Sequence, residues 1–255
     1  MASEATRAAP HGAQRVRKGL LLFFFLLFPV VFNFLSPYLS LSGAMQGAVS
    51  GSLLFFGLLL ASSLFLGRGF CGWVCPGGAV QELCFAVNDR RVRGRRLDWL
   101  KYLIWVPWLG LIAFGLARAA ADGSLTVQPR YLMDAWVSID RPAQFITYYL
   151  VLALIVVPSL LVGRRTMCHA ICWMAPFMIV GRRLRNAARW PALRLRADPQ
   201  QCTSCGTCTR GCPMSLPVQQ MVAAGRMERA ECILCGSCVS TCPAAVIRLR
   251  FGAGR

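Results

Sequence analysis

The chain has 255 residues, of which 56% are hydrophobic and 15% are charged, and its formal net charge is +18. This composition is too apolar for a soluble domain of this length and indicates a membrane protein. The positive charge does not indicate a nucleic-acid-binding protein, because the basic residues cluster at the ends of apolar stretches, where the positive-inside rule explains them.

Four apolar segments are predicted to cross the membrane as helices. They follow residues 1–18, whose small, polar and basic composition is typical of a disordered tail. The run 19–67 contains no charged residue and no histidine, and a stretch rich in Ser, Gly and Pro divides it. Each part can cross a hydrocarbon core of about 30 Å at about 1.5 Å per residue. Together with two later segments, the predicted spans are 19–39, 47–67, 99–121 and 143–162.

The charges of the loops predict the orientation. The loop 68–98 carries six arginines and the region 164–196 carries eight, whereas 40–46 is uncharged and 118–142 balances three Arg with three Asp. The positive-inside rule therefore predicts that both termini lie in the cytoplasm. We interpret 182–196 as a basic interfacial linker, whose arginines face anionic lipid head groups, between a membrane domain (19–181) and a C-terminal domain (197–255).

The C-terminal domain contains the pattern C-x2-C-x2-C-x3-C-P twice, thirty residues apart. Zinc sites usually show two C-x2-C pairs separated by a longer loop, and disulfides need an oxidising compartment, so both are disfavoured. The pattern resembles that of bacterial two-cluster ferredoxins, in which the fourth cysteine of each run ligates the other cluster. This resemblance implies one [4Fe–4S] cluster on Cys202, Cys205, Cys208 and Cys242, and a second on Cys232, Cys235, Cys238 and Cys212.

The residues around these runs predict a small α+β fold. Gly206 and Gly236 stand at matching places, where the lack of a Cβ allows the backbone to approach the cluster. Apolar and basic residues alternate over 193–196 and 247–251, which predicts two strands that pair with each other. The segment 218–229 is predicted to be a short helix between the two runs.

A second pair of cysteine motifs follows the predicted membrane helices. Cys71 and Cys75 come after the second span, and Cys168 and Cys172 come after the fourth, ninety-seven residues later. The order helix, helix, C-x3-C thus occurs twice and indicates an internal duplication, in which a pseudo-twofold axis brings four thiols together. These thiols could hold a further Fe–S or Cu(I) centre, act as redox dithiols, or pack as small apolar residues.

Two other residues near these motifs are candidates of lower priority. Cys84 has no counterpart in the pattern, and we interpret it as structural. His169 lies inside the second motif, where it could be a metal ligand, a proton acceptor for quinol, or a structural residue with its hydrogen bonds satisfied.

The sequence C-G-W-V-C-P after a membrane helix, the second C-x3-C and the two ferredoxin runs together resemble the NapH family of membrane-bound ferredoxin-type proteins. The C-terminal half of NosR, MauN and CcoG share parts of this plan. One departure is Trp173 after Cys172, where NapH-like proteins usually have proline.

The resemblance implies a function in electron transfer. An electron-transfer subunit of this type would pass electrons between the membrane quinol pool and a redox partner protein through two cytoplasmic clusters. The alternative is a maturation or metal-handling factor, like CcoG, that uses the clusters to reduce or deliver a metal such as copper to a client oxidoreductase. In that case the two C-x3-C motifs would be the working site.

Overall fold

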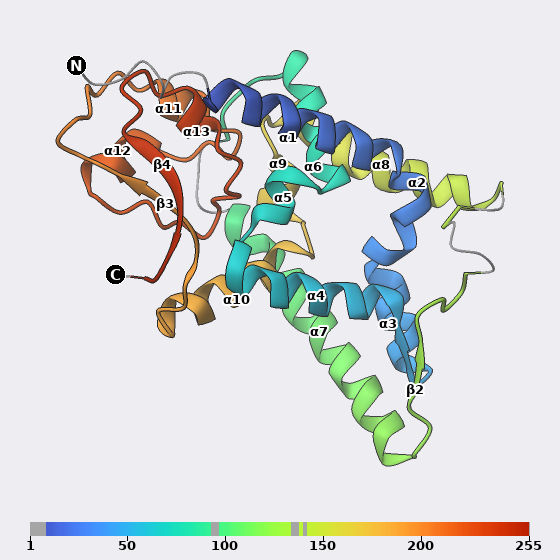
Figure 1. The fold of residues 1–255 in the computed structure, drawn as a ribbon. Helices are drawn as coiled ribbons and strands as arrows, with labels where there is room; N and C mark the ends of the chain where they lie inside the picture. Colours follow the sequence, from blue (N-terminus) through green and yellow to red (C-terminus); the bar gives the residue numbers. More distant parts are fainter. Residues whose placement is uncertain (1–8, 93–96, 134–137, 140–141, 255) are drawn as a thin grey trace.

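The computed structural model describes residues 9–92, 97–133, 138–139 and 142–254, and it is mainly helical (Figure 1). A large helical part carries a small α+β part, formed by the end of the chain, at one side. Of the predicted disordered tail, 1–8 lie outside the described residues. The rest of that prediction is wrong, because helix α1 (Ala9–Leu26) already includes this segment. Its Arg17 is buried, because Glu82 provides it with a carboxylate partner.

The helical part contains two similar halves. The first consists of α1, α2 (Phe28–Val31), η2 (Phe32–Leu35), α3 (Pro37–Met45), β1 (Ala48–Ser50), α4 (Gly51–Leu66), α5 (Gly69–Trp73), α6 (Pro76–Leu83) and η3 (Cys84–Ala86). The second consists of α7 (Leu97–Ala121), β2 (Thr126–Gln128), α8 (Gln144–Leu161), α9 (Thr166–Ala170) and α10 (Ala175–Ala187). Strands β1 and β2 form a short parallel pair between the halves, with Val49 opposite Val127.

Each half of the helical part packs against the other half. Helix α4 of the first half packs on α10 of the second, and α8 of the second packs on α6 of the first. The first of these contacts is so close that a Cβ on Gly181 of α10 would lie 1.8 Å from Oγ of Ser63 in α4. In both halves a long helix precedes a five-residue helix that carries the first cysteine of the C-x3-C motif. This reciprocal arrangement agrees with the predicted internal duplication.

The four predicted membrane spans are confirmed only in part. Helices α7 and α8 are long and apolar enough to cross a membrane, over Asp98–Ala121 and Gln144–Leu161. The first predicted span is broken, since Gly12–Leu26 and Phe28–Leu35 meet at an angle of 61°. Pro29 near the start of α2 explains the break, because proline offers no N–H to the preceding turn. The second predicted span corresponds to α4, which has only 16 residues.

The C-terminal part has the predicted α+β organisation. It consists of β3 (Ala192–Ala197), α11 (Thr207–Arg210), α12 (Val218–Ala223), α13 (Ser237–Ser240) and β4 (Ile247–Gly252). The two strands pair antiparallel, with Leu195 opposite Leu249, so the predicted strand pairing is confirmed. Gly206 and Gly236 both have φ near +70°, at 72° and 74°, and each precedes a one-turn helix. The predicted helix 218–229 is shorter than expected and ends at Ala223.

The interpretation of 182–196 as a lipid-facing linker is wrong for three of its arginines. Arg182 and Arg185 lie on α10 and Arg194 lies on β3, and all three side chains are buried. Arg182 and Arg194 bind the carboxylate of Glu228 from the C-terminal part, and Arg185 lies 3.9 Å from it. These arginine side chains therefore point into the protein and not toward lipid head groups, because the carboxylate of Glu228 forms charge-assisted hydrogen bonds with them.

Candidate functional site

The eight cysteines of the ferredoxin-type runs line two separate small cavities. One cavity is lined by Cys202, Cys205, Cys208 and Cys242. The other is lined by Cys212, Cys232, Cys235 and Cys238. The fourth cysteine of each run thus lines a cavity with the three of the other run, the grouping that the resemblance to two-cluster ferredoxins implies. Four thiols around one cavity are the donor set of a [4Fe–4S] cluster, so these residues fit such a group.

The two sets differ in their exposure. In the first set, here called the distal set, Cys205 is exposed and Cys202 and Cys242 are partly exposed. Hydrogen bonding from Thr207 lowers the pKa of the Cys205 thiol to about 7. In the second set, here called the proximal set, all four thiols are buried, and burial raises the pKa of Cys212 to about 12. The distal set therefore faces solvent, and the proximal set lies inside the protein.

The two C-x3-C motifs meet in the helical part and form what we call the thiol core. Cys71, Cys75, Cys168 and Cys172 are each at most 5% exposed. Burial raises the pKa of Cys75 well above its usual value, and the charges of the other three thiols of the core raise it further, so all four lie within electrostatic range of one another. Sγ of Cys71 lies 3.9 Å from Sδ of Met178, and Gln81 donates to Sγ of Cys168 at 3.1 Å. Cys84 belongs to neither group.

Two buried ionic groups flank the thiol core, and the sequence analysis did not identify them. Glu82 lies between Arg17 and Arg165, at 2.9 Å and 2.5 Å. Glu231 lies between Arg68 and Lys101, at 2.7 Å and 2.6 Å. Arg68 and Arg165 each stand three residues before the first cysteine of a C-x3-C motif, and both side chains are fully buried. This repetition at a spacing of ninety-seven residues is the signal that could have revealed them.

These carboxylates stay ionised in spite of their burial. Burial alone would raise the pKa of Glu82, but the cations of Arg165 and Arg17 more than offset this effect and lower it. Likewise burial opposes ionisation of Glu231, and Arg68 and Lys101 hold its pKa at about 2. The thiol core is thus surrounded by four cations and two anions, with an excess of positive charge.

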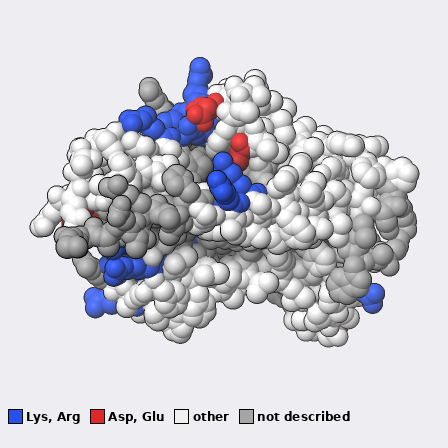
Figure 2. All heavy atoms as spheres, turned by 45° about the horizontal axis from the view of Figure 1, so that its top comes forward, with Lys and Arg blue, Asp and Glu red and all other residues white. Residues whose placement is uncertain are grey.

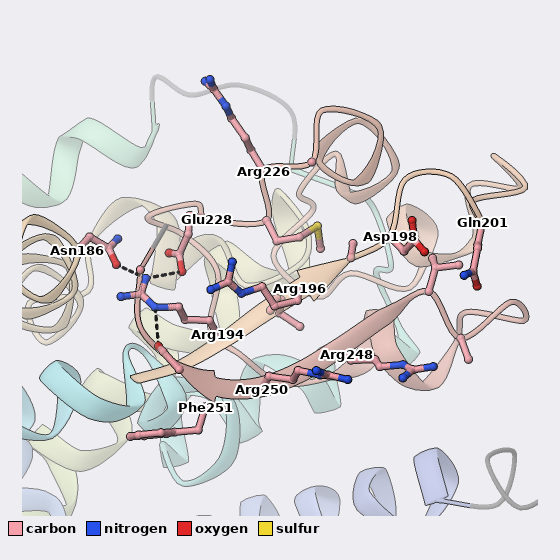
Figure 3. Close-up of a pocket in the computed structure, with 18 residues that line it drawn as sticks. Asn186, Arg194, Arg196, Asp198, Gln201, Arg226, Glu228, Arg248, Arg250 and Phe251 are labelled. Atoms are coloured by element: carbon pink, nitrogen blue, oxygen red, sulfur yellow. Dashed lines mark hydrogen bonds and ion pairs between the residues drawn. The ribbon is translucent and has the colours of Figure 1, made fainter. Parts of the chain in front are cut away.

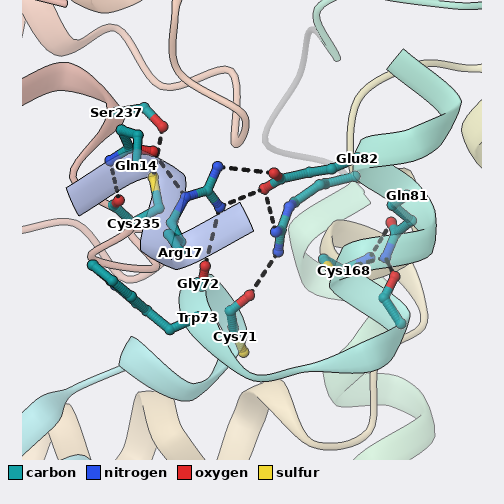
Figure 4. A network of polar contacts seen from close by, with 12 residues as sticks. Gln14, Arg17, Cys71, Gly72, Trp73, Gln81, Glu82, Cys168, Cys235 and Ser237 are labelled. Atoms are coloured by element: carbon teal, nitrogen blue, oxygen red, sulfur yellow. Dashed lines mark hydrogen bonds and ion pairs between the residues drawn. The ribbon is translucent and has the colours of Figure 1, made fainter. Parts of the chain in front are cut away.

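The loop of the first C-x3-C motif lies beside the loop of the proximal set, and Figure 4 shows Cys71, Gly72 and Trp73 near Cys235. Trp73, between Cys71 and Cys75, donates from Nε1 to the carbonyl oxygen of Leu234 at 3.0 Å. Gln14 of α1 donates to the carbonyl oxygen of Cys235 at 2.9 Å. A Cβ on Gly72 would lie 3.2 Å from the Cα of Cys235, so only glycine allows this approach of the two loops. The loop of one C-x3-C motif therefore packs on the loop that carries three proximal cysteines.

Comparisons with known proteins agree with this division of the chain. A family model described as "4Fe-4S binding domain" matches residues 50–96, and one described as "4Fe-4S dicluster domain" matches 194–243. The ferredoxin-type protein MauN of Methylorubrum extorquens is 29% identical over 69% of this chain and 59% of its own length. MauN of Methylobacillus flagellatus is 25% identical over 69% and 60%, and the regulatory protein NosR of Pseudomonas aeruginosa is 31% identical over 67% and 23%.

The chain carries two 4Fe-4S family domains and is similar to ferredoxin-type proteins such as MauN and to NosR, which is consistent with the NapH-, NosR- and MauN-like superfamily. It spans about three fifths of the length of the two MauN proteins. No solved structure is significantly similar to it. The superfamily is one of iron–sulfur proteins, and the apolar helices α7 and α8 agree with membrane association.

His169 of this ferredoxin-type protein lies at the edge of the thiol core. Its Nδ1 is 2.5 Å from Asp98 at the start of α7, and its Nε2 is buried without a hydrogen-bond partner in the described part of the chain. Donor atoms of Asp98, His169 and Glu231 lie within 4.8 Å of one another. Because both oxygens of Glu231 already bind cations, this group is poorly suited to a metal ion. Among the roles predicted for His169, the carboxylate partner of Nδ1 agrees with that of a structural residue.

A basic groove lies beside the distal set of this ferredoxin-type protein (Figure 3). Its volume is about 850 Å³, and it runs along strands β3 and β4. Arg226, Arg248 and Arg250 line it with exposed side chains. Val246 lines both the groove and the cavity of the distal set. In Figure 2, Lys and Arg gather mainly at and around the C-terminal part, and much of the remaining visible surface is uncharged.

Proposed function

We propose that this protein is a membrane-anchored electron-transfer protein that passes electrons between the quinol pool and a redox partner protein. The observation that carries the proposal is the contact between the loop of the first C-x3-C motif and the loop of the proximal set, through Gly72 and Trp73 on one side and Leu234 and Cys235 on the other. This contact places buried thiols of the helical part next to the ferredoxin-type domain, and the distal set then leads to solvent.

The two cysteine sets provide the electron-carrying groups of this function. Cys202, Cys205, Cys208 and Cys242 would hold one [4Fe–4S] cluster, and Cys232, Cys235, Cys238 and Cys212 the other. Each such cluster supplies one-electron transfer. Oxidation of a quinol to a quinone releases two electrons and two protons, so two one-electron carriers match the stoichiometry, and the protons pass to water.

The thiol core is proposed to hold a further anionic metal–thiolate centre. Nε and Nη2 of Arg68 and Nε of Arg165 are buried without hydrogen-bond partners in the described part of the chain. Burial raises the pKa of the Cys71 thiol, and the nearby cations of Arg68 and Arg165 partly offset this effect. Cys71, Cys75, Cys168 and Cys172 as thiolates would give these N–H groups acceptors. The match of 50–96 to a 4Fe-4S binding domain supports an Fe–S centre.

A second candidate function is the handling of a soft metal such as copper for a client oxidoreductase. The specific observation in its favour is Sδ of Met178, 3.9 Å from Sγ of Cys71. Thiolate and thioether ligands together favour Cu(I). In this case the thiol core would be the working site, and the ferredoxin-type domain would supply electrons to it.

The localisation is proposed from the charges. We place the protein in the bacterial inner membrane, with both termini and the ferredoxin-type domain in the cytoplasm. The concentration of Lys and Arg around the C-terminal part supports this orientation. The partner protein would dock at the basic groove, because Arg226, Arg248 and Arg250 surround the solvent-facing route to the distal set. An acidic surface on the partner is the complement of this groove.

The experiment that tests the electron-transfer function uses anaerobic proteoliposomes containing the full chain with its clusters. A short-chain quinol is added, and cluster reduction is followed by EPR and by bleaching of the visible absorption. We expect reduction at a rate that increases with quinol concentration. Intact clusters that dithionite reduces but quinol does not would overturn the proposal, and copper binding lost on mutation of the thiol core would then favour the second candidate.

A further inference from the structure

A cavity between the helical part and the ferredoxin-type domain is not explained by the cysteine sites. It has a volume of about 550 Å³ and is lined by α1, α6, the loop after η3 and the ferredoxin-type domain. Such a volume is typical of sites for small organic ligands. The cavity thus joins the helix α1, which is part of a candidate membrane span, to the domain that carries the clusters.

One side of this cavity is apolar. Leu21, Leu22 and Phe25 line it from α1, and Leu83 lines it from the end of α6. Leu22 and Leu83 are 53% and 59% exposed, so the apolar side is open at the surface of the protein. In a membrane this opening would admit a lipid-soluble molecule directly from the bilayer.

The other side is polar but almost neutral. Arg17 binds both oxygens of Glu82 at 2.9 Å, and Arg164 binds both oxygens of Asp89 at 2.5 Å. In the described part of the chain, Lys18 is the one cation of the lining without a carboxylate partner. A phosphate group would need several free cations, whereas a neutral ring with hydroxyl groups needs hydrogen-bond donors and acceptors. The charge balance therefore favours a neutral polar head.

The polar side also lies next to the proximal set. Gly211 and Pro213, which line the cavity, are the neighbours of Cys212, and Arg164 donates to the carbonyl oxygen of Cys212 at 3.2 Å. Ser237, also in the lining, lies two residues after Cys235. Pro213 lines both this cavity and the cavity of the proximal set, so the two cavities share a wall beside Cys212.

We propose that this cavity binds the ring of a lipid-soluble quinol, with its tail along α1. The inference rests on the proposed electron-transfer function and gives it a site. In the reaction two O–H bonds of the quinol break, and the quinone, two electrons and two protons are formed. The oxidant would be the pair of [4Fe–4S] clusters held by the two cysteine sets, each of which would take one electron, and the protons would pass to water beside Asp89, which is 59% exposed.

The test is photolabelling of the full chain in nanodiscs with an azido-ubiquinone analogue, followed by mass-spectrometric mapping of the labelled peptides. The variant Leu83→Trp fills the apolar side of the cavity. The control Leu150→Trp introduces the same side chain on α8, where Leu150 is 70% exposed and outside the lining. We expect labels within 17–25 or 79–85, reduced about tenfold in L83W and unchanged in L150W, corresponding to about 1.4 kcal/mol in affinity.

Two results would overturn this inference. One is labelling that maps elsewhere or that L83W leaves unchanged. The other is loss of the label on addition of phosphatidylglycerol but not of unlabelled quinone, which would identify a lipid site. Quinol-dependent cluster reduction distinguishes failure of this binding site from failure of the proposed electron-transfer function. If wild-type clusters are reduced by quinol while the label maps elsewhere, only this site fails, whereas intact clusters that quinol does not reduce would refute the proposed function itself.

Discussion

Gly72 lies directly against Ile233, so that a Cβ at residue 72 would come within 2.4 Å of the carbonyl oxygen of Ile233. Gly72 belongs to the loop of the first C-x3-C motif, and Ile233 belongs to the loop of the proximal set. In the proposed function, electrons pass between these two loops. An electron path between them depends on the separation of these loops. The glycine is therefore the residue that keeps the two parts close together.

Replacement of Gly72 by alanine tests this closeness. We expect Gly72→Ala to push the loops apart and to lower the stability of the interface by about 1–3 kcal/mol, the usual cost of overpacking. Quinol-dependent cluster reduction should become slower while the iron content stays the same. The control is Gly69→Ala in the same helix, where the nearest atom to the added Cβ, in Leu66, is 3.6 Å away. Equal rates in both variants would contradict the prediction.

Removal of a buried carboxylate should destabilise the helical part. In Glu82→Gln the cations of Arg17 and Arg165 stay buried without their counter-charge, which we expect to cost about 3–5 kcal/mol. The exposed pair of Arg118 and Asp122 is the control, because Asp122→Asn should change stability by about 0.5 kcal/mol or less. Urea unfolding in detergent, followed by tryptophan fluorescence, measures both. Similar losses in the two variants would argue against a buried ionic group.

The same carboxylate predicts a pH dependence. Because the pKa of Glu82 is lower in the folded protein than its ordinary value of 4.5, its contribution to stability is present above that pH and is lost as the pH falls below it. The free energy of unfolding of the wild-type protein should therefore decrease more steeply on acidification below pH 4.5 than that of Glu82→Gln. Parallel curves for the two proteins would exclude this role.

The thiol core makes a prediction about metal content. We expect about twelve irons per anaerobically purified chain, and about eight after replacement of Cys71, Cys75, Cys168 and Cys172 by serine, because a third centre is lost and two clusters remain. The matched control is Cys84→Ser, which removes a buried cysteine outside the three groups. Iron and acid-labile sulfide analysis with EPR of the reduced protein measures the difference. About eight irons in both wild type and quadruple variant would leave the thiol core without an Fe–S centre.

The basic groove predicts a charge-dependent partner reaction. Reversal of Arg248 and Arg250 to glutamate should slow electron transfer to an acidic acceptor such as flavodoxin by about tenfold at low salt and weaken its salt dependence, because steering by charge is lost. Reversal of the exposed Arg118 on α7 serves as the control. Stopped-flow reduction of the acceptor gives the rates. Equal slowing by both changes would mean that net charge acts, and not the groove.

The sequence was sufficient for the parts of the molecule that depend on local spacing. The alternation around Leu195 and Leu249 predicted a strand pair, and the resemblance of the cysteine runs to those of two-cluster ferredoxins implied that Cys212 groups with the second run. In contrast, Glu82 and Glu231 bind cations 65 to 163 positions away, and no local pattern marks such a partner. The role of Arg182 was misjudged for the same reason, because its partner Glu228 lies 46 positions later. Apolar composition likewise predicted α7 and α8, but it did not predict the break of the first span, which Pro29 explains.

The reciprocal packing of the two halves determines when the thiol core can form during synthesis. Helix α4 has its partner in α10, and α6 has its partner in α8, so the first half emerges from the ribosome without the surfaces that cover Cys71 and Cys75. These thiols stay accessible until more than ninety further residues have been translated, up to Cys168 and Cys172. The thiol core therefore cannot be completed until long after the first motif, Cys71 and Cys75, has been translated. A truncated nascent chain would present half of the ligands to oxidants and to metal donors.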